Sequence, residues 1–197
     1  MASKSTNDIE RFNSWAKTYD RSIMQRLFFG PIHSKMLAMT EKEYVSRKPP
    51  ISVLDVGCGT GRLSRAASAY WPHAGFFGVD PAEQMISEAK RLNPVASFEV
   101  STAESLPFPD QTFDLVLSSL SFHHWADQAR GLREIARVLR PEGRFCLADH
   151  TATLANLFHE KVKSRAQIRG LISDTGLSVV TQQGAWTRLV LVTIAKK

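Results

Sequence analysis

The sequence predicts a doubly wound α/β fold, in which a mostly parallel, seven-stranded sheet ends in an antiparallel C-terminal hairpin. Three observations predict it. Between residues 51 and 150, short runs rich in β-branched residues alternate with helical segments, which is the pattern of βαβ crossovers. The first of these runs passes directly into a glycine-rich turn at 57–61. The last two predicted strands, 177–182 and 186–195, are separated by residues 183–185 alone, and a link that short permits only a hairpin.

The N-terminal segment is predicted to be helical from residue 6 to residue 47, with an early break near Asp20. A second interruption is expected at Gly30-Pro31, because proline cannot donate a hydrogen bond within a helix. Apolar side chains recur here at helical spacing, at Ile23, Met24, Leu27, Phe28, Met36, Leu37 and Met39. Three roles stay open for this stripe: a lid over a site, ordinary packing against the sheet, or contact with a membrane surface.

The remaining elements follow in alternation. Lys48-Pro49-Pro50 stops the helix, and the short apolar run at 51–56 predicts a buried strand. Further strands are expected at 75–79, 96–100, 113–118 and 143–149, and helices at 63–70, 82–92 and 126–139. Elements of these lengths imply parallel crossovers with helices on both faces of the sheet.

Composition excludes several classes of protein. A chain of 197 residues with 43% hydrophobic and 22% charged residues is typical of one folded domain, not of a disordered or fibrous protein. The apolar runs are far shorter than the ~18 residues of a membrane span, and Met1–Glu10 has no apolar signal region. Two cysteines, Cys58 and Cys146, are too few for a disulfide framework or a four-ligand metal site. We therefore expect a cytoplasmic protein.

The net charge of +6 is spread unevenly. Residues 1–50 carry +4, residues 51–150 carry −3 and residues 151–197 carry +5. Basic ends can favour an anionic partner such as nucleic acid or a lipid headgroup. The alternative is a solvated surface, which the scattered positions of the basic residues favour.

A glycine-rich turn at the end of the first strand is the strongest local signal for a ligand. Its sequence, Val53-Leu-Asp-Val-Gly-Cys-Gly-Thr-Gly61, has the spacing G-x-G-x-G. A dinucleotide-binding fingerprint would need glycine at position 62, which is Arg62. Asp55 lies two residues before the first glycine, and an acid there favours a ligand with a positive group.

A second acid, Asp80, ends the second predicted strand about twenty residues beyond the glycines, where nucleotide-binding α/β folds hold a ribose diol. Asp80 and Asp55 together predict a nucleoside with a cationic group beside its ribose. An adenosyl sulfonium amino acid has both features. The alternative is a tight turn and helix cap that bind nothing.

The sequence resembles the class I S-adenosylmethionine-dependent methyltransferases, and especially the type 11 group that includes ubiquinone- and menaquinone-biosynthesis-like enzymes. The resemblance runs from about Phe12 to the C-terminus. It rests on the glycine-rich turn and on five further motifs, at Phe12–Asp20, Gly78–Met85, Ala103–Phe108, Phe113–Val116 and Glu134–Pro141. It implies a Rossmann-like methyltransferase fold and S-adenosyl-L-methionine as cofactor, with S-adenosyl-L-homocysteine as product. It also implies one domain over 1–197, with a helical lid at 1–47, a cofactor-binding core at 51–150 and a helix and hairpin at 151–197.

The resemblance implies a role for each matching position. Asp55 and the backbone of Gly57, Cys58, Gly59 and Gly61 would hold the methionine moiety, and Asp80 with its neighbour Pro81 the ribose. The other implied positions are Tyr19 closing over the cofactor, Met85 on the adenine face, Thr102, Ala103 and Glu104 at the adenine edge, and Ser118 beneath the methyl group. Met85 could equally be core filler. The family often has an acid where this chain has Thr102, whose hydroxyl accepts a weaker hydrogen bond.

The sequence lacks the motifs of several classes of methyltransferase, which narrows the choice of methyl acceptor. Ser118–Phe122 replaces the motif typical of adenine methylation, and paired glutamates typical of arginine methylation are lacking after the fourth strand. Neither cysteine lies in a loop that could supply a nucleophile for cytosine C5. Metal-assisted catechol chemistry needs clustered oxygen ligands, and Asp149 alone makes none. A small or lipid-like acceptor is left, with methyl transfer to O, N or C and no metal.

His123 is the candidate general base, with His124 and His150 as less favoured alternatives, because they follow the fourth and fifth strands near the cofactor edge. The alternative for His123 and His124 is a simple helix lead-in. Two other functions stay open: a nucleic-acid-directed methyltransferase that uses the basic ends, and a non-catalytic module that binds S-adenosylmethionine. Peripheral membrane contact through the N-terminal helices is a further expectation.

Overall fold

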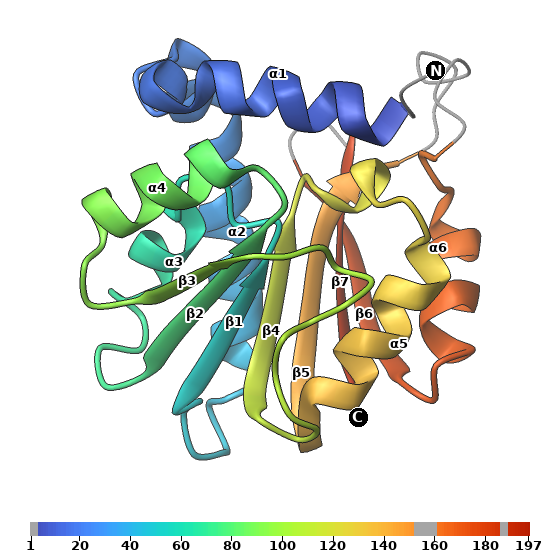
Figure 1. Ribbon diagram of the computed structural model, residues 1–197. Helices are drawn as coiled ribbons and strands as arrows, with labels where there is room; N and C mark the ends of the chain where they lie inside the picture. The colour runs from blue at the N-terminus through green and yellow to red at the C-terminus, as the bar shows by residue number, and fades with distance from the viewer. Residues whose placement is uncertain (1–3, 152–160, 186–188) are drawn as a thin grey trace.

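The computed structural model describes residues 4–151, 161–185 and 189–197, arranged around one seven-stranded sheet (Figure 1). The strand order is β3-β2-β1-β4-β5-β7-β6. The strands are β1 (Ser52–Val56), β2 (Gly75–Asp80), β3 (Ser97–Val100), β4 (Phe113–Ser119), β5 (Leu139–His150), β6 (Ser178–Ala185) and β7 (Val190–Lys196). The first five pair in parallel, whereas β7 pairs antiparallel with both β5 and β6. The predicted fold class is confirmed.

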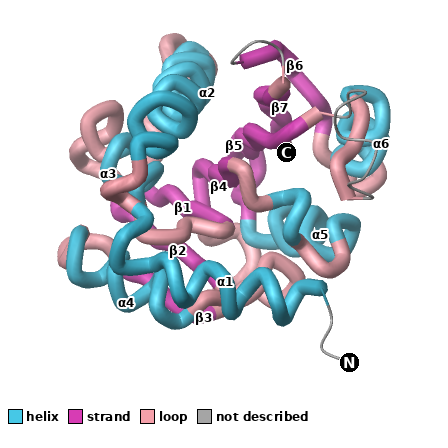
Figure 2. Tube along the Cα trace, turned by 90° about the horizontal axis from the view of Figure 1, so that it is seen from above, coloured by secondary structure: helices cyan, strands magenta, loops and turns pink. Residues whose placement is uncertain are grey.

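Helices cover both faces of the sheet, as Figure 2 shows for α2 and α5. On one face, α2 (Gly30–Lys42) and α3 (Arg62–Ala67) bury residues such as Met36 and Leu63 against Leu115 of β4 and Ile194 of β7. The other face carries α5 (Gln128–Val138) and α6 (Arg165–Ser173). Helix α4 (Glu83–Leu92) packs beside β2 and β3. Because β1 and β4 are buried on both faces, their carboxyl ends are held rigidly at one edge of the sheet.

The N-terminal segment forms α1 (Lys4–Tyr19), a π-helical segment at Gln25–Phe29 and then α2. The break near Asp20 is confirmed. The expected interruption at Gly30-Pro31 is wrong, because the chain stays helical there and only changes from π to α geometry. Pro31 sits in the first turn of α2, where a missing N–H costs nothing. Helix α2 ends at Lys42, earlier than the predicted residue 47.

The predicted turn of the C-terminal hairpin is also wrong. Residues 183–185 belong to β6, where Gln183 pairs with Val192 and Ala185 with Val190. Within the described residues the last strand begins at Val190, and the first part of the predicted strand, residues 186–188, lies outside the described part of the chain. Local composition misplaces the turn because Gln183-Gly184-Ala185 resembles a loop, whereas pairing with the hydrophobic β7 extends the strand.

Asp114 holds the lower ends of the central strands together. Its Oδ2 accepts hydrogen bonds from the backbone N–H groups of Ile51 and Ser52, both at 3.0 Å, and its Oδ1 accepts from Arg140 at 3.0 Å. These bonds lie at the edge of the sheet opposite the glycine-rich turn.

Replacing Asp114 by alanine should therefore lower the free energy of unfolding by about 1–3 kcal/mol, because two backbone donors and one guanidinium lose their acceptor. Urea unfolding measures this change. The affinity of the variant for S-adenosylhomocysteine should equal that of the native protein. A loss of affinity would contradict our conclusion that the hydrogen bonds of Asp114 lie apart from the ligand site.

Candidate active site

The predicted ligand site lies at the carboxyl edge of the parallel strands, beneath α1 (Figure 1). Helix α1 crosses above this edge and packs on α4 through Ala16, Ala82 and Met85, and Gln84 donates its backbone N–H to Asn13 at 2.9 Å. A cavity of about 140 Å³ is enclosed between α1 and the ends of β1, β2 and β4. Loops at this edge are where open α/β sheets bind ligands.

The glycine-rich turn has three left-handed residues, Gly57, Gly59 and Gly61, with φ of 75°, 52° and 73°. A Cβ on Gly57 would lie 2.3 Å from the Cβ of Ser121, so no larger residue fits. Gly59 is different, because nothing lies within 4 Å of its missing Cβ, and it borders the cavity. The turn thus combines one tightly packed glycine with one that leaves its backbone open to a ligand.

Asp80 ends β2 with its carboxylate held by the backbone. Oδ2 accepts from the N–H of Gly59 at 2.9 Å, and Oδ1 accepts from the N–H of Ala82 at 2.9 Å. Burial raises the pKa of Asp80, while these two hydrogen bonds oppose the rise. A carboxylate oriented in this way keeps further lone pairs for hydroxyl groups in the cavity that it lines.

Asp55 lies deeper, in the middle of the sheet edge. Ser64 donates its hydroxyl to Oδ2 of Asp55 at 3.2 Å. Burial raises the pKa of Asp55 to about 7, with a smaller contribution from the charge of Asp80 and an opposing one from Ser64. The neighbouring Cys58 is also buried, which raises the pKa of its thiol well above the usual value. Asp55 and Cys58 line a small cavity of about 50 Å³ with Gly57 and Gly59.

The far end of the first cavity is lined by the other predicted residues, Pro81, Met85, Thr102, Ala103 and Glu104. Met85 is almost fully buried and packs on Ala16 and Ala82, so it serves both the core and the cavity wall. The carboxylate of Glu104 accepts a hydrogen bond from the backbone N–H of Asp127 at 3.0 Å, which orients the side chain.

Two aromatic side chains lie where the cavities meet. Tyr19 and Phe29 line both cavities described above, the one bordered by Asp80 and the small one beside Asp55. They also line a third cavity, which has a volume of about 550 Å³. Leu120, with an unfavourable left-handed φ of 54°, separates the first from the third. The volume of this third cavity, hereafter the large cavity, is within the range of about 300–1,000 Å³ usual for small-molecule sites.

The large cavity is apolar with basic groups around it. Aromatic side chains of Phe12, Trp15, Tyr19 and Phe29 form much of its wall. Its other lining residues include Arg11, His123, His124 and His150, and among the residues that the structure describes no aspartate or glutamate lines it. The cavity therefore suits a molecule with an apolar body that is neutral or anionic, not a cation.

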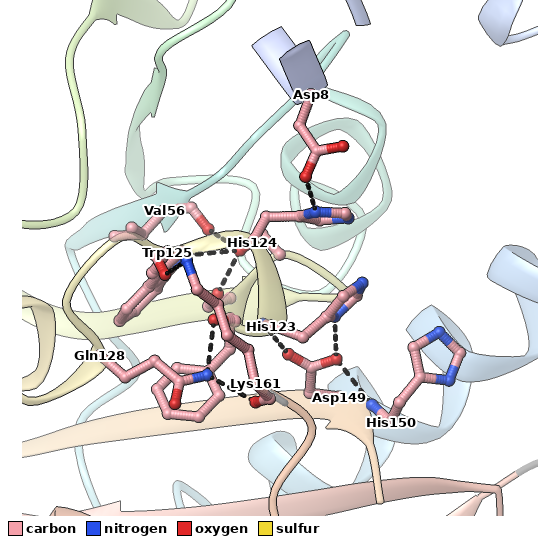
Figure 3. Close-up of polar contacts among 12 residues, drawn as sticks. Asp8, Val56, His123, His124, Trp125, Gln128, Asp149, His150 and Lys161 are labelled. Atoms are coloured by element: carbon pink, nitrogen blue, oxygen red, sulfur yellow. Dashed lines mark hydrogen bonds and ion pairs between the residues drawn. The ribbon is translucent and has the colours of Figure 1, made fainter. Parts of the chain in front are cut away.

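His123 is held by Asp149 at the end of β5 (Figure 3). Nδ1 of His123 lies 2.6 Å from Oδ1 of Asp149, and the backbone N–H of His123 donates to Oδ2 at 2.8 Å. Burial lowers the pKa of His123, but the charge and hydrogen bond of Asp149 outweigh it, so the pKa is raised. For His124, burial and the neighbouring His123 lower the pKa despite its contact with Asp8.

Helix α1 is tied to the site at both ends. Near its start, Asp8 lies 3.0 Å from Nδ1 of His124 (Figure 3). After its end, Asp20 accepts from the hydroxyl of Thr60 and from Arg65, both at 2.5 Å. The helix is therefore fixed to the glycine-rich turn and to the segment after β4.

The structure brings together all but two of the predicted residues at these cavities. Ser118 lines none of the three, because its side chain points inward to Ser121, with 2.8 Å between the hydroxyl oxygens. Ser119, Leu120 and Ser121 line the first cavity instead. Gly61 also lies away from the walls, where a Cβ would lie 2.8 Å from the Phe98 ring, and it caps α3.

Several site residues were missed by sequence reasoning, namely Asp8, Gln25, Leu120, Trp125 and Asp149. Asp149 carried a usable signal, because it ends a strand parallel to β4 and so reaches the same edge as His123. Asp8 and Gln25 carried none, since only the fold of the N-terminal segment brings them to the cavities.

Two further features of the described residues bear on function. They contain no group of three or more His, Cys, Asp and Glu side chains placed to hold a metal ion. In the same part of the chain, no helix combines the length and apolar character needed to cross a membrane.

Comparison with known proteins gives a consistent set of similarities. Residues 54–147 match a family model described as a methyltransferase domain. An uncharacterized methyltransferase of Bacillus subtilis, YcgJ, is 37% identical over 122 residues, which cover 59% of this chain and 47% of that protein. A demethylmenaquinone methyltransferase of Deinococcus radiodurans is 32% identical over 184 residues, covering 91% of this chain and 74% of the relative.

Among solved structures, a methyltransferase of Haloferax volcanii in complex with the Trm112 methyltransferase activator aligns with a TM-score of 0.76 and 24% identity. The alignment covers 94% of this chain and 96% of that one. The fold is thus shared over nearly the whole length. The chain spans about half the length of the first curated relatives that it matches.

Proposed function

This chain belongs to the S-adenosylmethionine-dependent methyltransferase family, and we propose that it transfers a methyl group from S-adenosylmethionine to a small or lipid-like acceptor. One observation carries the proposal. The cavity bordered by Gly59 and Asp80 meets the large, mostly apolar cavity at Tyr19 and Phe29, so a cofactor and an acceptor would face one another there.

The residues present fit the cofactor. Asp80 is oriented by two backbone donors and has lone pairs left for the ribose hydroxyls. The open backbone of Gly59 and the buried Asp55 suit the cationic amino acid portion. Pro81, Met85, Thr102, Ala103 and Glu104 line the same cavity and would border the adenine. When bound, the cofactor would supply an electrophilic methyl group on sulfur, and the electron pair of the C–S bond would stay with that sulfur.

The contribution of the chain is mainly positioning. An in-line displacement gains about 7–11 kcal/mol when the reacting groups are held in the correct geometry. Helix α1, tied down through Asp8 and Asp20, covers the site and would limit the access of water to it. Tyr19 and Phe29, which border both cavities, would hold the nucleophile and the methyl donor against one another where the cavities meet.

An apolar acceptor is supported by the walls of the large cavity and by the relative that is named for demethylmenaquinone. Three apolar side chains beside the cavity are exposed: Ile23 at 69%, Met24 at 50% and Leu27 at 64%. Met24 also lines the cavity. This exposed group, with Arg21 next to it in the chain, would let the protein rest on a membrane surface while a lipid-like acceptor enters.

The first test is calorimetric titration with S-adenosylhomocysteine, followed by transfer of a radiolabelled methyl group to a short-chain demethylmenaquinol. We expect saturable binding with one site, and transfer that depends on the acceptor. No binding of S-adenosylhomocysteine would contradict the cofactor assignment, whereas binding without transfer to any acceptor in a broad panel would favour a non-catalytic binding module.

The membrane contact is tested with vesicles of phosphatidylethanolamine and phosphatidylglycerol. The double variant Ile23→Ser/Leu27→Ser should lose cosedimentation with the vesicles, because both side chains are exposed and apolar. Val95→Ser is the matched control, since Val95 is 94% exposed but follows α4, away from the large cavity. If the native protein, the double variant and Val95→Ser bound vesicles equally well, the exposed apolar side chains would make no membrane contact.

A further inference from the structure

The contact between His123 and Asp149 defines which nitrogen of the imidazole is basic. Asp149 is almost fully buried, and its Oδ1 lies 2.6 Å from Nδ1 of His123 (Figure 3). Nδ1 therefore carries the hydrogen and donates it, which leaves the lone pair on Nε2. Among the described residues Nε2 of His123 has no hydrogen-bond partner, and His123 lines the large cavity.

Asp149 is itself fixed in place. Its Oδ2 accepts the backbone N–H of His123 at 2.8 Å, and Oδ1 also accepts the backbone N–H of His150 at 2.6 Å. The carboxylate therefore cannot rotate away from the imidazole without losing backbone hydrogen bonds. This is the arrangement in which a carboxylate orients a histidine and stabilises it once protonated.

We propose that Asp149 positions His123 to take the proton of a hydroxyl-bearing aromatic acceptor bound in the large cavity. The inference rests on the proposed methyltransferase function and adds the chemical class of the acceptor. Aromatic walls at Phe12, Trp15 and Phe29 match an aromatic ring. Arg11 and three histidines line the cavity, and no carboxylate of the described part of the chain does, which favours an acceptor that becomes anionic over an ammonium.

The proton and electrons balance in a single transfer. The acceptor's O–H proton moves to Nε2 of neutral His123, and for methylation on oxygen the freed lone pair forms the new bond to the methyl carbon. For ring methylation, the oxygen lone pair forms a C=O bond while a ring π pair forms the new bond to the methyl carbon. The proton of that ring carbon then passes to water, and the electron pair of its C–H bond restores the aromatic ring as a phenolate. The imidazolium formed on His123 is stabilised by Asp149 and returns its proton to water when the site opens.

The charged and titratable groups around His123 come from three elements. Asp149 and His150 belong to β5, and His124 lies in the same short helix as His123, with ring centroids 4.1 Å apart. Asp8 and Arg11 face it from α1 and have opposite effects on its pKa. Asp149 is the strongest of these influences after burial, so removing its charge should lower the pKa of His123.

The decisive experiment uses 4-nitrophenol, whose anion is yellow, bound to the protein with S-adenosylhomocysteine. At a pH below the dye's own pKa, the native protein should increase the ionised fraction of bound dye, because His123 accepts its proton. His123→Gln should abolish this increase and Asp149→Asn should reduce it. His73→Gln and Asp174→Asn, both exposed, are matched controls that should behave like the native protein.

Transfer kinetics give a second readout. We expect His123→Gln to lower kcat about 100-fold or more with a phenolic acceptor. Asp149→Asn should lower kcat at least tenfold and move the rising limb of the pH profile to lower pH, since the pKa of His123 falls. Asp149→Glu should recover part of the loss. A structural role for Asp149 would not shift the pH profile.

The outcomes separate the two proposals. If the native protein binds no S-adenosylhomocysteine or transfers no methyl group, the proposed function fails. If it does both, but His123→Gln neither lowers kcat nor changes dye ionisation, the inference about His123 and Asp149 is overturned. The His123→Gln variant retains the hydrogen bond from the backbone N–H of residue 123 to Asp149. It therefore tests the role of His123 even if Asp149→Asn fails to fold.

Discussion

Replacing Asp80 by alanine is expected to weaken binding of S-adenosylhomocysteine about 10- to 150-fold, the equivalent of about 1.5–3 kcal/mol for hydrogen bonds to a charged group. The carboxylate is already oriented by Gly59 and Ala82, so the protein has no ordering left to do when the ribose arrives. Calorimetric titration of native and variant protein at one pH measures the change.

A control is needed because the alanine variant also removes the acceptor of two backbone donors. Glu83→Ala, on an exposed acid in the first turn of α4, keeps those bonds and should bind normally. Asp80→Asn can keep one backbone contact and should be intermediate. If all these proteins had the same dissociation constant, Asp80 would not hold the ribose.

Replacing Asp55 by asparagine is expected to stabilise the ligand-free protein near pH 8 by about 2–4 kcal/mol. The pKa of Asp55 is raised to about 7, so its carboxyl binds a proton more tightly in the folded chain than in the unfolded chain. Its contribution to stability is therefore full at low pH and is lost as the pH rises from about 4 to about 7. Asparagine has no proton to lose, so this dependence should vanish.

Urea unfolding at several pH values between 4 and 8 tests this expectation, with Asp174→Asn as an exposed control. The same Asp55→Asn variant should bind S-adenosylhomocysteine at least tenfold more weakly, because the negative charge opposite the cationic amino group is gone. A variant that lost both stability and affinity would show that Asp55 is needed mainly for packing, against this expectation.

The fold was predictable from sequence because its signals are local and repeated. β-Branched runs such as 51–56 and 113–118, separated by helices, lead to a parallel sheet whatever their exact ends. The errors arise where tertiary contacts override composition. Pairing with β7 turns Gln183-Gly184-Ala185 into strand, and a π-helical segment lets the chain continue through Gly30-Pro31.

The ligand site also has parts that local sequence predicts and parts that only tertiary contacts determine. Asp55, the three glycines and Asp80 lie at strand ends, where their sequence context indicates their place. Ser118 shows the limit of such reasoning, because successive strand side chains face opposite ways and a shift of one residue selects Ser119 for the cavity. The pairs His123–Asp149 and His124–Asp8 join distant segments. The order of the strands could have indicated the first pair, whereas no pattern in the sequence indicates the second.

The shared walls at Tyr19 and Phe29 have a thermodynamic consequence. Because each side chain borders all three cavities, a ligand that reorients either of them changes the shape offered to the other ligand. Linkage then requires that donor and acceptor alter each other's affinity by the same factor. In the proposed reaction, the demethylated cofactor and the methylated product would present different groups at this junction, so the affinity of the protein for one would depend on whether the other is bound.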